Sequence, residues 1–455
     1  MVRPRMTPVH RFPGWAMAML LAWSLVRLPG WEPLSAQAPS PPAPAIRGAA
    51  DGRPPAVRPP GNLHRRSPLP NVVILVGEGW TESDLVLRGA SPHLERLASE
   101  GVRWTSAYAG APSARVSREA LITGRHSGHG RLRGVGAVAL ANEDVTLAEV
   151  LRGAGHRTAA VGVWDLGGNG TPGHPMRQGF SDWFGFLDAR EALDLHPKAL
   201  WRNDEVFDNL IDTRGALANY APDWFARFAT NYIQVHEDHP FFLYVSHPLP
   251  GGAPDAAVRS ARLATWDRLV GAVVRELERS RIRRETILVV TGTGAPGTGT
   301  SGGSVAPLDE ARLRVPLLFS WPGRIPAGRT NDRPVALWDV LPTVSALARV
   351  PGPQGLDGVS LAPELLAVDE AAPSTPPSPR AGGLYWETAE VPPRRALRWD
   401  HWKVVEATPG GRLGLHDLRS DPGASRDVGP ENPGILAEGR RRLLEAADPL
   451  PQPRP

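Results

Sequence analysis

The sequence predicts an α/β fold in which helices cover both faces of a mostly parallel sheet, a three-layer sandwich. Three apolar, β-branched runs, Asn71–Val76, Phe241–Val245 and Thr286–Val290, have the character of strands that are buried on both faces. Segments with helical patterns alternate with these runs, an order typical of parallel sheets. Beyond residue 353 the pattern changes to short alternating runs, which predict a small antiparallel sheet with a terminal helix.

Two segments precede the first strand. Residues 1–37 carry basic residues ahead of a short apolar run, Trp15–Val26, and a small-residue cleavage pattern, which together indicate a signal peptide. The apolar run is shorter than the roughly 20 residues that cross a bilayer, and an uncleaved N-terminal anchor is the alternative. Residues 38–69 are rich in proline, alanine, arginine and glycine, which predicts a flexible linker. We therefore expect an exported bacterial protein, periplasmic or extracellular.

Residues 70–352 form the predicted α/β domain, and its first helices have recognisable starts. Ser91 and Pro92 are suited to the N-cap and the first helical position, and Thr146 with Glu149 forms a capping box. The elements expected in this half are a helix from Pro92 to Glu100, a strand at Val102–Tyr108, a helix at Ser117–Leu121, a helix from Leu147 to Gly153 or Gly155, and a strand at Thr158–Val161.

The remaining elements follow the same logic. A glycine-rich segment, Gly292–Gly303, lacks the lysine of a phosphate-binding P-loop, so we interpret it as a flexible loop. Residues 353–455 form the predicted C-terminal subdomain. The expected elements are a helix at Arg262–Arg279, a strand at Val315–Phe319, a helix at Leu337–Ala348, a hinge at Ala371–Pro379, short strands within Gly383–Glu387, Leu397–Glu406 and Arg412–Asp417, and a helix at Pro433–Ala446.

Composition excludes some functions. The chain has 455 residues, 41% of them hydrophobic, and a formal net charge of +4 with basic and acidic residues interspersed. No nucleic acid is expected as a partner, because no module of interleaved aromatic and basic residues is present. No membrane span is expected apart from the N-terminal signal. The chain contains no cysteine, so its stability must come from the core and not from disulfides.

The segment Ala111–Arg125 carries the strongest motif. It resembles the signature of the sulfatases, in which a Cys or Ser stands four residues before an Arg and a Leu-Leu-Thr-Gly-Arg tail follows; here Arg118 and Thr123-Gly124-Arg125 match in register. The resemblance implies the alkaline phosphatase-like α/β fold. Seven further stretches are similar to the family in the same order, at residues 91–105, 123–134, 200–203, 315–328, 339–343, 355–361 and 415–422.

The nucleophile position of this signature is Ala114. In the family the Cys is oxidised to a formylglycine, whose hydrated aldehyde attacks sulfur, and a methyl group cannot do this. A Ser-type nucleophile would have to be Ser113, one residue early, or Ser117, three residues late. Displacements of about 1 Å already cost roughly a hundredfold in rate, so both are weak candidates and no catalytic residue is expected.

The metal ligands implied by the resemblance are also missing. Family members bind a divalent cation, usually Ca²⁺, through an Asp-Asp pair after the first strand and an Asp-Asn pair after a later one. These positions fall on Gly77, Glu78, Thr293 and Gly294. Because hard cations need several oxygen ligands, no metal and no other cofactor is expected, and Ca²⁺ would bind only if the site has been rebuilt.

The cations that hold the sulfate group in the family are lost as well. The Lys of one motif becomes Val163, followed by Trp164 and Asp165, and the expected His is Gly251. A further Lys falls near Val305. Of the positive groups aimed at developing charge, only Arg118 remains from the signature.

Several polar residues have both a functional and a structural interpretation. Arg118 could neighbour a bound anion or pair with an acid, and Glu78 could be a residual ligand, an acid or base, or an exposed strand-end carboxylate. His126, His129 and His247 could be metal ligands by residue type, although structural roles are the interpretation that we favour.

The sequence thus predicts a pseudo-sulfatase: a protein that keeps the fold, has lost hydrolysis of sulfuric esters, and binds a sulfated or anionic ligand or a protein partner. The alternative is an active sulfuric or phosphoric ester hydrolase with a rebuilt site that uses Ser113 or Ser117 with Glu78. A rebuilt site needs replacement carboxylates near the strand ends, and Glu78, Asp165 and Asp309 are the candidates.

Overall fold

The structure is a computed structural model of the chain, and it describes residues 69–85, 91–133, 139–208, 219–248, 256–294, 308–367, 380, 382–388, 393–406, 408 and 410–448. The predicted signal peptide, almost all of the predicted linker and the hinge at Ala371–Pro379 lie outside the described residues. So do Gly251, Val305 and most of the loop Gly292–Gly303.

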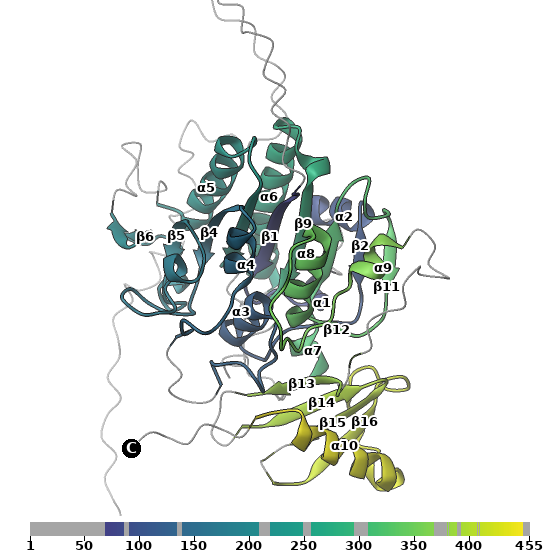
Figure 1. The fold of residues 1–455 in the computed structure, drawn as a ribbon. Coiled ribbons are helices and arrows are strands. Elements are labelled where there is room, and N and C mark those ends of the chain that lie inside the picture. Colours follow the sequence, from purple (N-terminus) through teal and green to yellow (C-terminus); the bar gives the residue numbers. More distant parts are fainter. Residues whose placement is uncertain are drawn as a thin grey trace, which may run out of the picture. The chain divides into compact units, whose positions relative to one another are not determined.

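A ten-stranded sheet forms the centre of the α/β domain (Figure 1). Its strand order is β11-β2-β10-β9-β1-β8-β4-β5-β6-β7, and the central strands from β9 to β5 are parallel. Its strands are β1 (Asn71–Gly77), β2 (Val102–Trp104), β4 (Arg157–Val163), β5 (Asp182–Phe186), β6 (Leu200–Arg202), β7 (Glu205–Phe207), β8 (Phe241–His247), β9 (Thr286–Gly292), β10 (Leu317–Ser320) and β11 (Arg329–Asn331). The predicted mostly parallel sheet is confirmed, with antiparallel pairing only at β10, β6 and β7.

The helices cover both faces of this sheet. They are α1 (Glu82–Leu85), α2 (Pro92–Ser99), α3 (Ala114–Thr123), α4 (Leu147–Gly153), α5 (Ala221–Val235), α6 (Ala256–Arg279), α7 (Glu310–Leu313), α8 (Val340–Ala348) and α9 (Ala362–Leu366). Strand β1 shows the three layers directly, because Val72, Ile74 and Val76 belong to one hydrophobic core and Val73 and Leu75 belong to the other. The first core includes residues of α3, α4 and α8, and the second includes residues of α2, α5 and α6.

The C-terminal part is a four-stranded antiparallel sheet with one helix, yellow in Figure 1, as predicted. Its elements are β13 (Leu384–Glu387), β14 (Arg395–Trp399), β15 (Trp402–Glu406), β16 (Leu413–Asp417) and α10 (Pro433–Glu445). The sheet is joined to the α/β domain by a buried ion pair, in which Nζ of Lys403 lies 2.7 Å from Oε1 of Glu310. The predicted run Leu397–Glu406 is two strands, because the chain turns at Asp400 with a positive φ of 51°.

Helix α2 begins where the sequence predicts, but its cap is different. Ser91 is the N-cap residue and its side chain makes no capping hydrogen bond. Instead the carboxylate of Asp267, on α6, accepts from the backbone N–H groups of His93 (3.3 Å) and Leu94 (2.9 Å). A carboxylate at this place satisfies free amide groups and interacts well with the helix dipole. The capping box at Thr146 and Glu149 is confirmed, with both of its hydrogen bonds present.

Several sequence-based boundaries are wrong; the helix expected from Arg262, for example, begins at Ala256. The run Val102–Tyr108 is not one strand: β2 ends at Trp104 and the next residues cross to a second sheet, where β3 (Ala107–Tyr108) pairs with β12 (Val335–Ala336). The signature helix begins at Ala114 and not at Ser117. Helix α5 and strand β5 were not predicted. Among the helices of the described residues, none combines the length and the apolar character that crossing a lipid bilayer requires.

Candidate functional site

The site predicted from the motifs lies at the carboxyl end of the central strands, where open parallel sheets place their ligands. Gly77, the last residue of β1, is in register with His247 of β8 and with Gly292 of β9. Glu78 and Thr293 therefore follow neighbouring strands. The structure brings both residues to the same place as Arg118 of α3.

Helix α3 positions the signature residues. Ser113 is its N-cap with an extended backbone, and its side chain makes no capping hydrogen bond. Ala114, which the resemblance aligns with the nucleophile of the family, is the first helical residue and is half-buried. Gly124 ends the helix in the left-handed conformation, with φ of 70°, and its N–H donates to the carbonyl of Ala120 at 3.0 Å.

Arg118 is fully buried and is held by two carboxylates. Its Nη1 lies 2.5 Å from Oε2 of Glu78, and its Nη2 lies 3.0 Å from Oδ2 of Asp165. Burial lowers the pKa of Arg118, but the charges of Glu78 and Asp165 outweigh this effect and the net pKa is raised above its ordinary value. The guanidinium is therefore a permanent cation whose charge is balanced inside the protein.

Both carboxylate oxygens of Glu78 accept hydrogen bonds from neighbouring side chains. Oε2 accepts from Arg118 and lies 3.5 Å from the Thr293 hydroxyl, and Oε1 accepts the hydroxyl hydrogen of Ser246. The Thr293 hydroxyl also accepts from the backbone N–H of Gly79 at 2.9 Å. Both groups that could contribute to a metal site are thus committed to other partners.

The residues present do not fit a calcium ion. Ca²⁺ takes about six to eight oxygen ligands, and the four degenerate positions supply one committed carboxylate and one committed hydroxyl. Gly294 has a φ of 80°, and a Cβ added there would lie 2.7 Å from the carbonyl oxygen of Arg312. Any ligand side chain at that position would be strained, which is a further reason why these residues do not fit the ion.

Asp165 completes the ion-pair network from a third strand end. It follows Trp164 after β4, has a positive φ of 56°, and its carbonyl accepts from Nε of Arg115 at 2.9 Å. The backbone of Asp165 is thereby fixed beside α3. Sequence reasoning named Asp165 as a strand-end carboxylate without pairing it with Arg118, and its position directly after the missing lysine and Trp164 was the available signal.

The two serines lie in different environments. Ser117 is fully buried, and its hydroxyl donates to the carbonyl of Ala111 at 3.0 Å and accepts from the N–H of Ala111 at 3.3 Å. Those contacts give Ser117 a structural role in closing the turn before α3. Ser113 is half-buried and lies next to Ala114 at the helix N-terminus.

The predicted histidines fall into two groups. His247 is buried at the end of β8 against the ring of Trp266, 5.4 Å between ring centroids. His126 and His129 are stacked at 4.4 Å and both approach Asp357, with Oδ1 of Asp357 lying 3.6 Å from Nε2 of His126 and 2.7 Å from Nδ1 of His129.

This trio has the composition of a metal site but not its chemistry. Nδ1 of His126 accepts the N–H of Gly128 at 3.1 Å, so in the neutral ring Nε2 carries the proton and points its N–H toward the carboxylate. A metal needs a lone pair on that nitrogen. Hydrogen bonds from the backbone N–H of His126 (2.9 Å) and from the ring of His129 (2.7 Å) to the Asp357 carboxylate join the 126–129 loop to the segment around Asp357.

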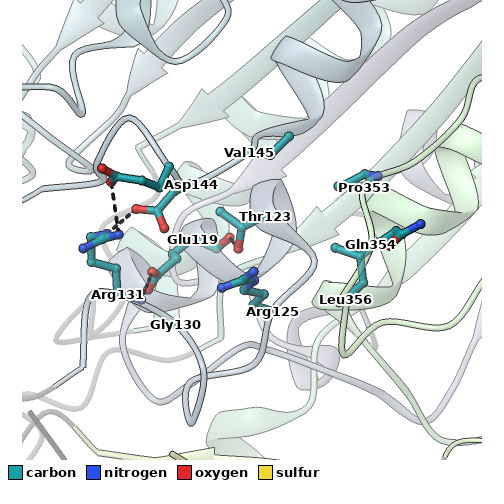
Figure 2. Close-up of a pocket in the computed structure, with 11 residues that line it drawn as sticks. Glu119, Thr123, Arg125, Gly130, Arg131, Asp144, Val145, Pro353, Gln354 and Leu356 are labelled. Atoms are coloured by element: carbon teal, nitrogen blue, oxygen red, sulfur yellow. Dashed lines mark hydrogen bonds and ion pairs between the residues drawn. The ribbon is translucent and has the colours of Figure 1, made fainter.

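A small cavity lies on the other side of α3 (Figure 2). It has a volume of about 40 Å³, and Glu119, Arg131 and Asp144 are among its lining residues. Glu119 accepts from the backbone N–H groups of Arg131 and Leu132 at 2.5 and 3.1 Å, and burial raises its pKa to about 7. Ligand pockets generally measure about 300–1,000 Å³, so this cavity serves the loop that follows the signature and not a substrate.

Known proteins share this fold and sequence pattern. Human arylsulfatase G is 28% identical over 418 residues, covering 76% of this chain and 78% of the relative. Two solved structures have the same fold with a TM-score of 0.68: a putative sulfatase from Bacteroides fragilis, 21% identical, covering 84% of this chain and 96% of its own, and a protein bound to its substrate D-glucosamine-2-N,6-O-disulfate, 19% identical, covering 83% and 97%.

The family model of the sulfatases matches residues 70–350, well over half of the chain. That span includes the ten-stranded sheet, the signature helix α3 and the strand ends that carry Glu78, Asp165 and Thr293. The fold is the alkaline phosphatase-like one. This chain is a member of the sulfatase family.

Proposed function

We propose that this chain is a pseudo-sulfatase, an exported protein that keeps the sulfatase fold and no longer hydrolyses sulfate esters. The observation that carries the proposal is the pairing of Arg118 with Glu78 and Asp165. Where the family places a nucleophile and a metal ion, this chain has a methyl group and an internal ion-pair network. A guanidinium supplies the positive charge beside the carboxylate, and it offers no vacant coordination position for a substrate oxygen.

The nucleophile, the metal ligands and the cations that hydrolysis requires in the family are replaced at separate positions of this chain. Ala114 cannot attack, and Val163 offers no cation to a leaving or transferring group. Stabilisation of developing charge commonly supplies several kcal/mol of rate acceleration, and here the one remaining cation is already neutralised. The role that remains is binding. A sulfated or anionic ligand is the first class to examine, because a structural relative is bound to a disulfated sugar substrate.

The test is calcium binding by calorimetry together with turnover of 4-nitrophenyl sulfate and 4-nitrophenyl phosphate. We expect no calcium binding above background and no turnover by the purified protein. The variant Ala114→Ser, which restores a hydroxyl at the nucleophile position, should also be inactive because the metal ligands are missing. Metal-dependent turnover by the unmodified chain would overturn the proposal.

One observation favours the alternative of a rebuilt ester hydrolase. Ser113 is half-buried, adjoins the nucleophile position, and makes no capping hydrogen bond. If Ser113 is a nucleophile, turnover should exist and should disappear in Ser113→Ala and in Glu78→Gln. The matched control is Ser99→Ala at the exposed end of α2, which should leave that turnover unchanged.

A further inference from the structure

A groove of about 480 Å³ opens at the edge of the ten-stranded sheet, where β5, β6 and β7 meet helix α5. Its main lining residues are Phe184, Phe207, Trp224 and Phe228, with Arg202 and Arg227. None of these side chains belongs to the network around Arg118. The groove is within the size range of pockets that bind small organic molecules, about 300–1,000 Å³.

The four aromatic rings form one continuous apolar surface. Phe184 is the buried floor, and its ring lies 5.8 Å from Phe207, 6.4 Å from Trp224 and 5.8 Å from Phe228. The rings of Phe184 and Phe228 are nearly parallel, at 10°. The other three rings are half-buried. A flat apolar molecule can therefore contact ring faces and edges in the geometries that aromatic pairs prefer.

Two arginine heads stand over these rings. The guanidinium of Arg202 lies 5.3 Å from the ring centroid of Phe228, and that of Arg227 lies 5.6 Å from Trp224. Both arginines are exposed residues. Stacking on an aromatic face holds a guanidinium in place while its N–H groups stay directed outward, ready to donate to an oxyanion.

Among the described residues, Arg202 has one ion-pair partner and Arg227 has none. Within the described residues, the only carboxylate within 4 Å of Arg202 is that of Asp182, at 3.6 Å, which is too long for a hydrogen bond. In the same part of the chain no carboxylate lies within 4 Å of the Arg227 head. The groove thus combines an apolar floor with a positive rim.

We propose that this groove binds a small aromatic anion, a planar ring that carries one sulfate, sulfonate or carboxylate group. The ring lies on the aromatic surface and the oxyanion accepts hydrogen bonds from Arg202 and Arg227. Guanidinium groups match the geometry of such oxyanions and bind them with charge-assisted hydrogen bonds. The groove proposal uses none of the residues on which the proposed pseudo-sulfatase function depends. An experiment can therefore contradict one of the two proposals and leave the other standing.

Calorimetry on the full chain tests this with three probes. Naphthalene-2-sulfonate has both the ring and the anion, 2-naphthol has only the ring, and inorganic sulfate has only the anion. We expect saturable one-to-one binding of naphthalene-2-sulfonate. The other two probes should bind at least about tenfold more weakly, since 2-naphthol lacks the anionic group and sulfate lacks the aromatic ring. Equal affinity for 2-naphthol, or no saturable binding of naphthalene-2-sulfonate, overturns the proposal.

Three variants place the binding in the groove. Arg202→Gln and Arg227→Gln should each weaken binding of naphthalene-2-sulfonate by roughly three- to tenfold, as expected for removing one exposed charge-assisted contact. The matched control is Arg190→Gln, an exposed arginine paired with Asp188 outside the groove, which should leave the affinity unchanged. Unchanged affinity in the double variant Arg202→Gln/Arg227→Gln contradicts the proposal, and a thermal melt of that variant confirms that it is folded.

Discussion

Arginines in two regions of this protein have opposite environments. At the carboxyl end of the central strands, Arg118 is fully buried and two carboxylates of the same chain balance its charge. At the sheet edge, Arg202 and Arg227 are exposed and stacked on aromatic rings, and within the described residues only Arg202 has a carboxylate, that of Asp182, within 4 Å. A buried charge must be neutralised by groups of the protein itself, whereas an exposed charge is solvated by water and can still bind a ligand. The difference indicates that Arg118 contributes to the fold, and it supports the proposal that the groove arginines bind a ligand.

The largest expected effect comes from breaking the buried pair. Glu78→Leu removes the nearer carboxylate and leaves the guanidinium of Arg118 buried with Asp165 alone. We expect the free energy of unfolding to fall by about 3 kcal/mol, because removing one partner of a buried ion pair is strongly destabilising. Urea unfolding at constant m-value measures this loss.

A matched control for this change lies on the surface. Glu445→Leu removes one partner of the exposed Arg441–Glu445 pair on α10, and it should change stability by no more than about 0.5 kcal/mol. Adding Arg118→Met to Glu78→Leu should recover part of the loss, since apolar replacement of a whole pair is tolerated. If Glu78→Leu behaves like the surface control, Arg118 is not a structural ion-pair partner.

An intermediate effect concerns pH and the buried histidine beside the site. Burial, with the charge of Arg268 as a smaller cause, lowers the pKa of His247 from its ordinary value to about 3. The folded state therefore keeps His247 neutral, while the unfolded chain takes up a proton below about pH 6.5. Stability from this group is complete above pH 6.5 and is lost as the pH falls toward 3. Each pH unit below 6.5 costs up to about 1.4 kcal/mol.

Thermal melts between pH 7.5 and pH 5 measure this dependence. The variant His247→Phe should flatten the acid side of the profile, because no proton uptake remains at that position. His239→Phe, at an exposed position, should leave the profile as it is. A profile that is identical in all three proteins would show that His247 does not couple folding to pH.

The smallest expected effect belongs to the sheet edge. Arg202→Gln and Arg227→Gln should each change the free energy of unfolding by less than about 0.5 kcal/mol, as is usual for exposed side chains. Arg118→Gln should be several times more destabilising. Urea unfolding of the three variants side by side is the measurement. A loss of about 2 kcal/mol for either groove variant would mean that the edge arginines also serve the fold.

The features that sequence reasoning predicted are those with local signals. The capping box at Thr146 and Glu149 involves residues three apart, and the structure has both of its hydrogen bonds. The apolar run of β1 is buried on both faces because its side chains alternate between the two hydrophobic cores, which the helices cover on either side of the sheet. Features set by distant contacts were missed. Tyr108, for example, leaves the main sheet because β3 pairs with β12, more than two hundred residues later.

At the candidate site, too, features with local sequence signals were predicted and features set by distant contacts were not. The apolar run of β1 predicted that Glu78 directly follows the strand end, and the structure has it there; the roles that the family motifs imply for Ala114 and Glu78 stay predictions. The partners of Arg118 could not be predicted, since Glu78 and Asp165 follow different strands and only the folded sheet brings them together. The groove was not predicted either. Arg202 lies in a stretch that resembles the family, while its aromatic partner Phe228 lies on α5, a helix that has no counterpart in the sequence-based prediction.

The cap of α2 by Asp267 has a consequence for how the chain is made. Asp267 is 174 residues after His93, whose N–H it accepts. On a ribosome α2 is therefore synthesised long before the group that completes its N-terminus. The central strand β1 is likewise synthesised long before its partners β8 and β9. Forming such distant contacts slows folding. The first hundred residues of the domain must therefore remain soluble until the later strands have been synthesised and can pair with β1.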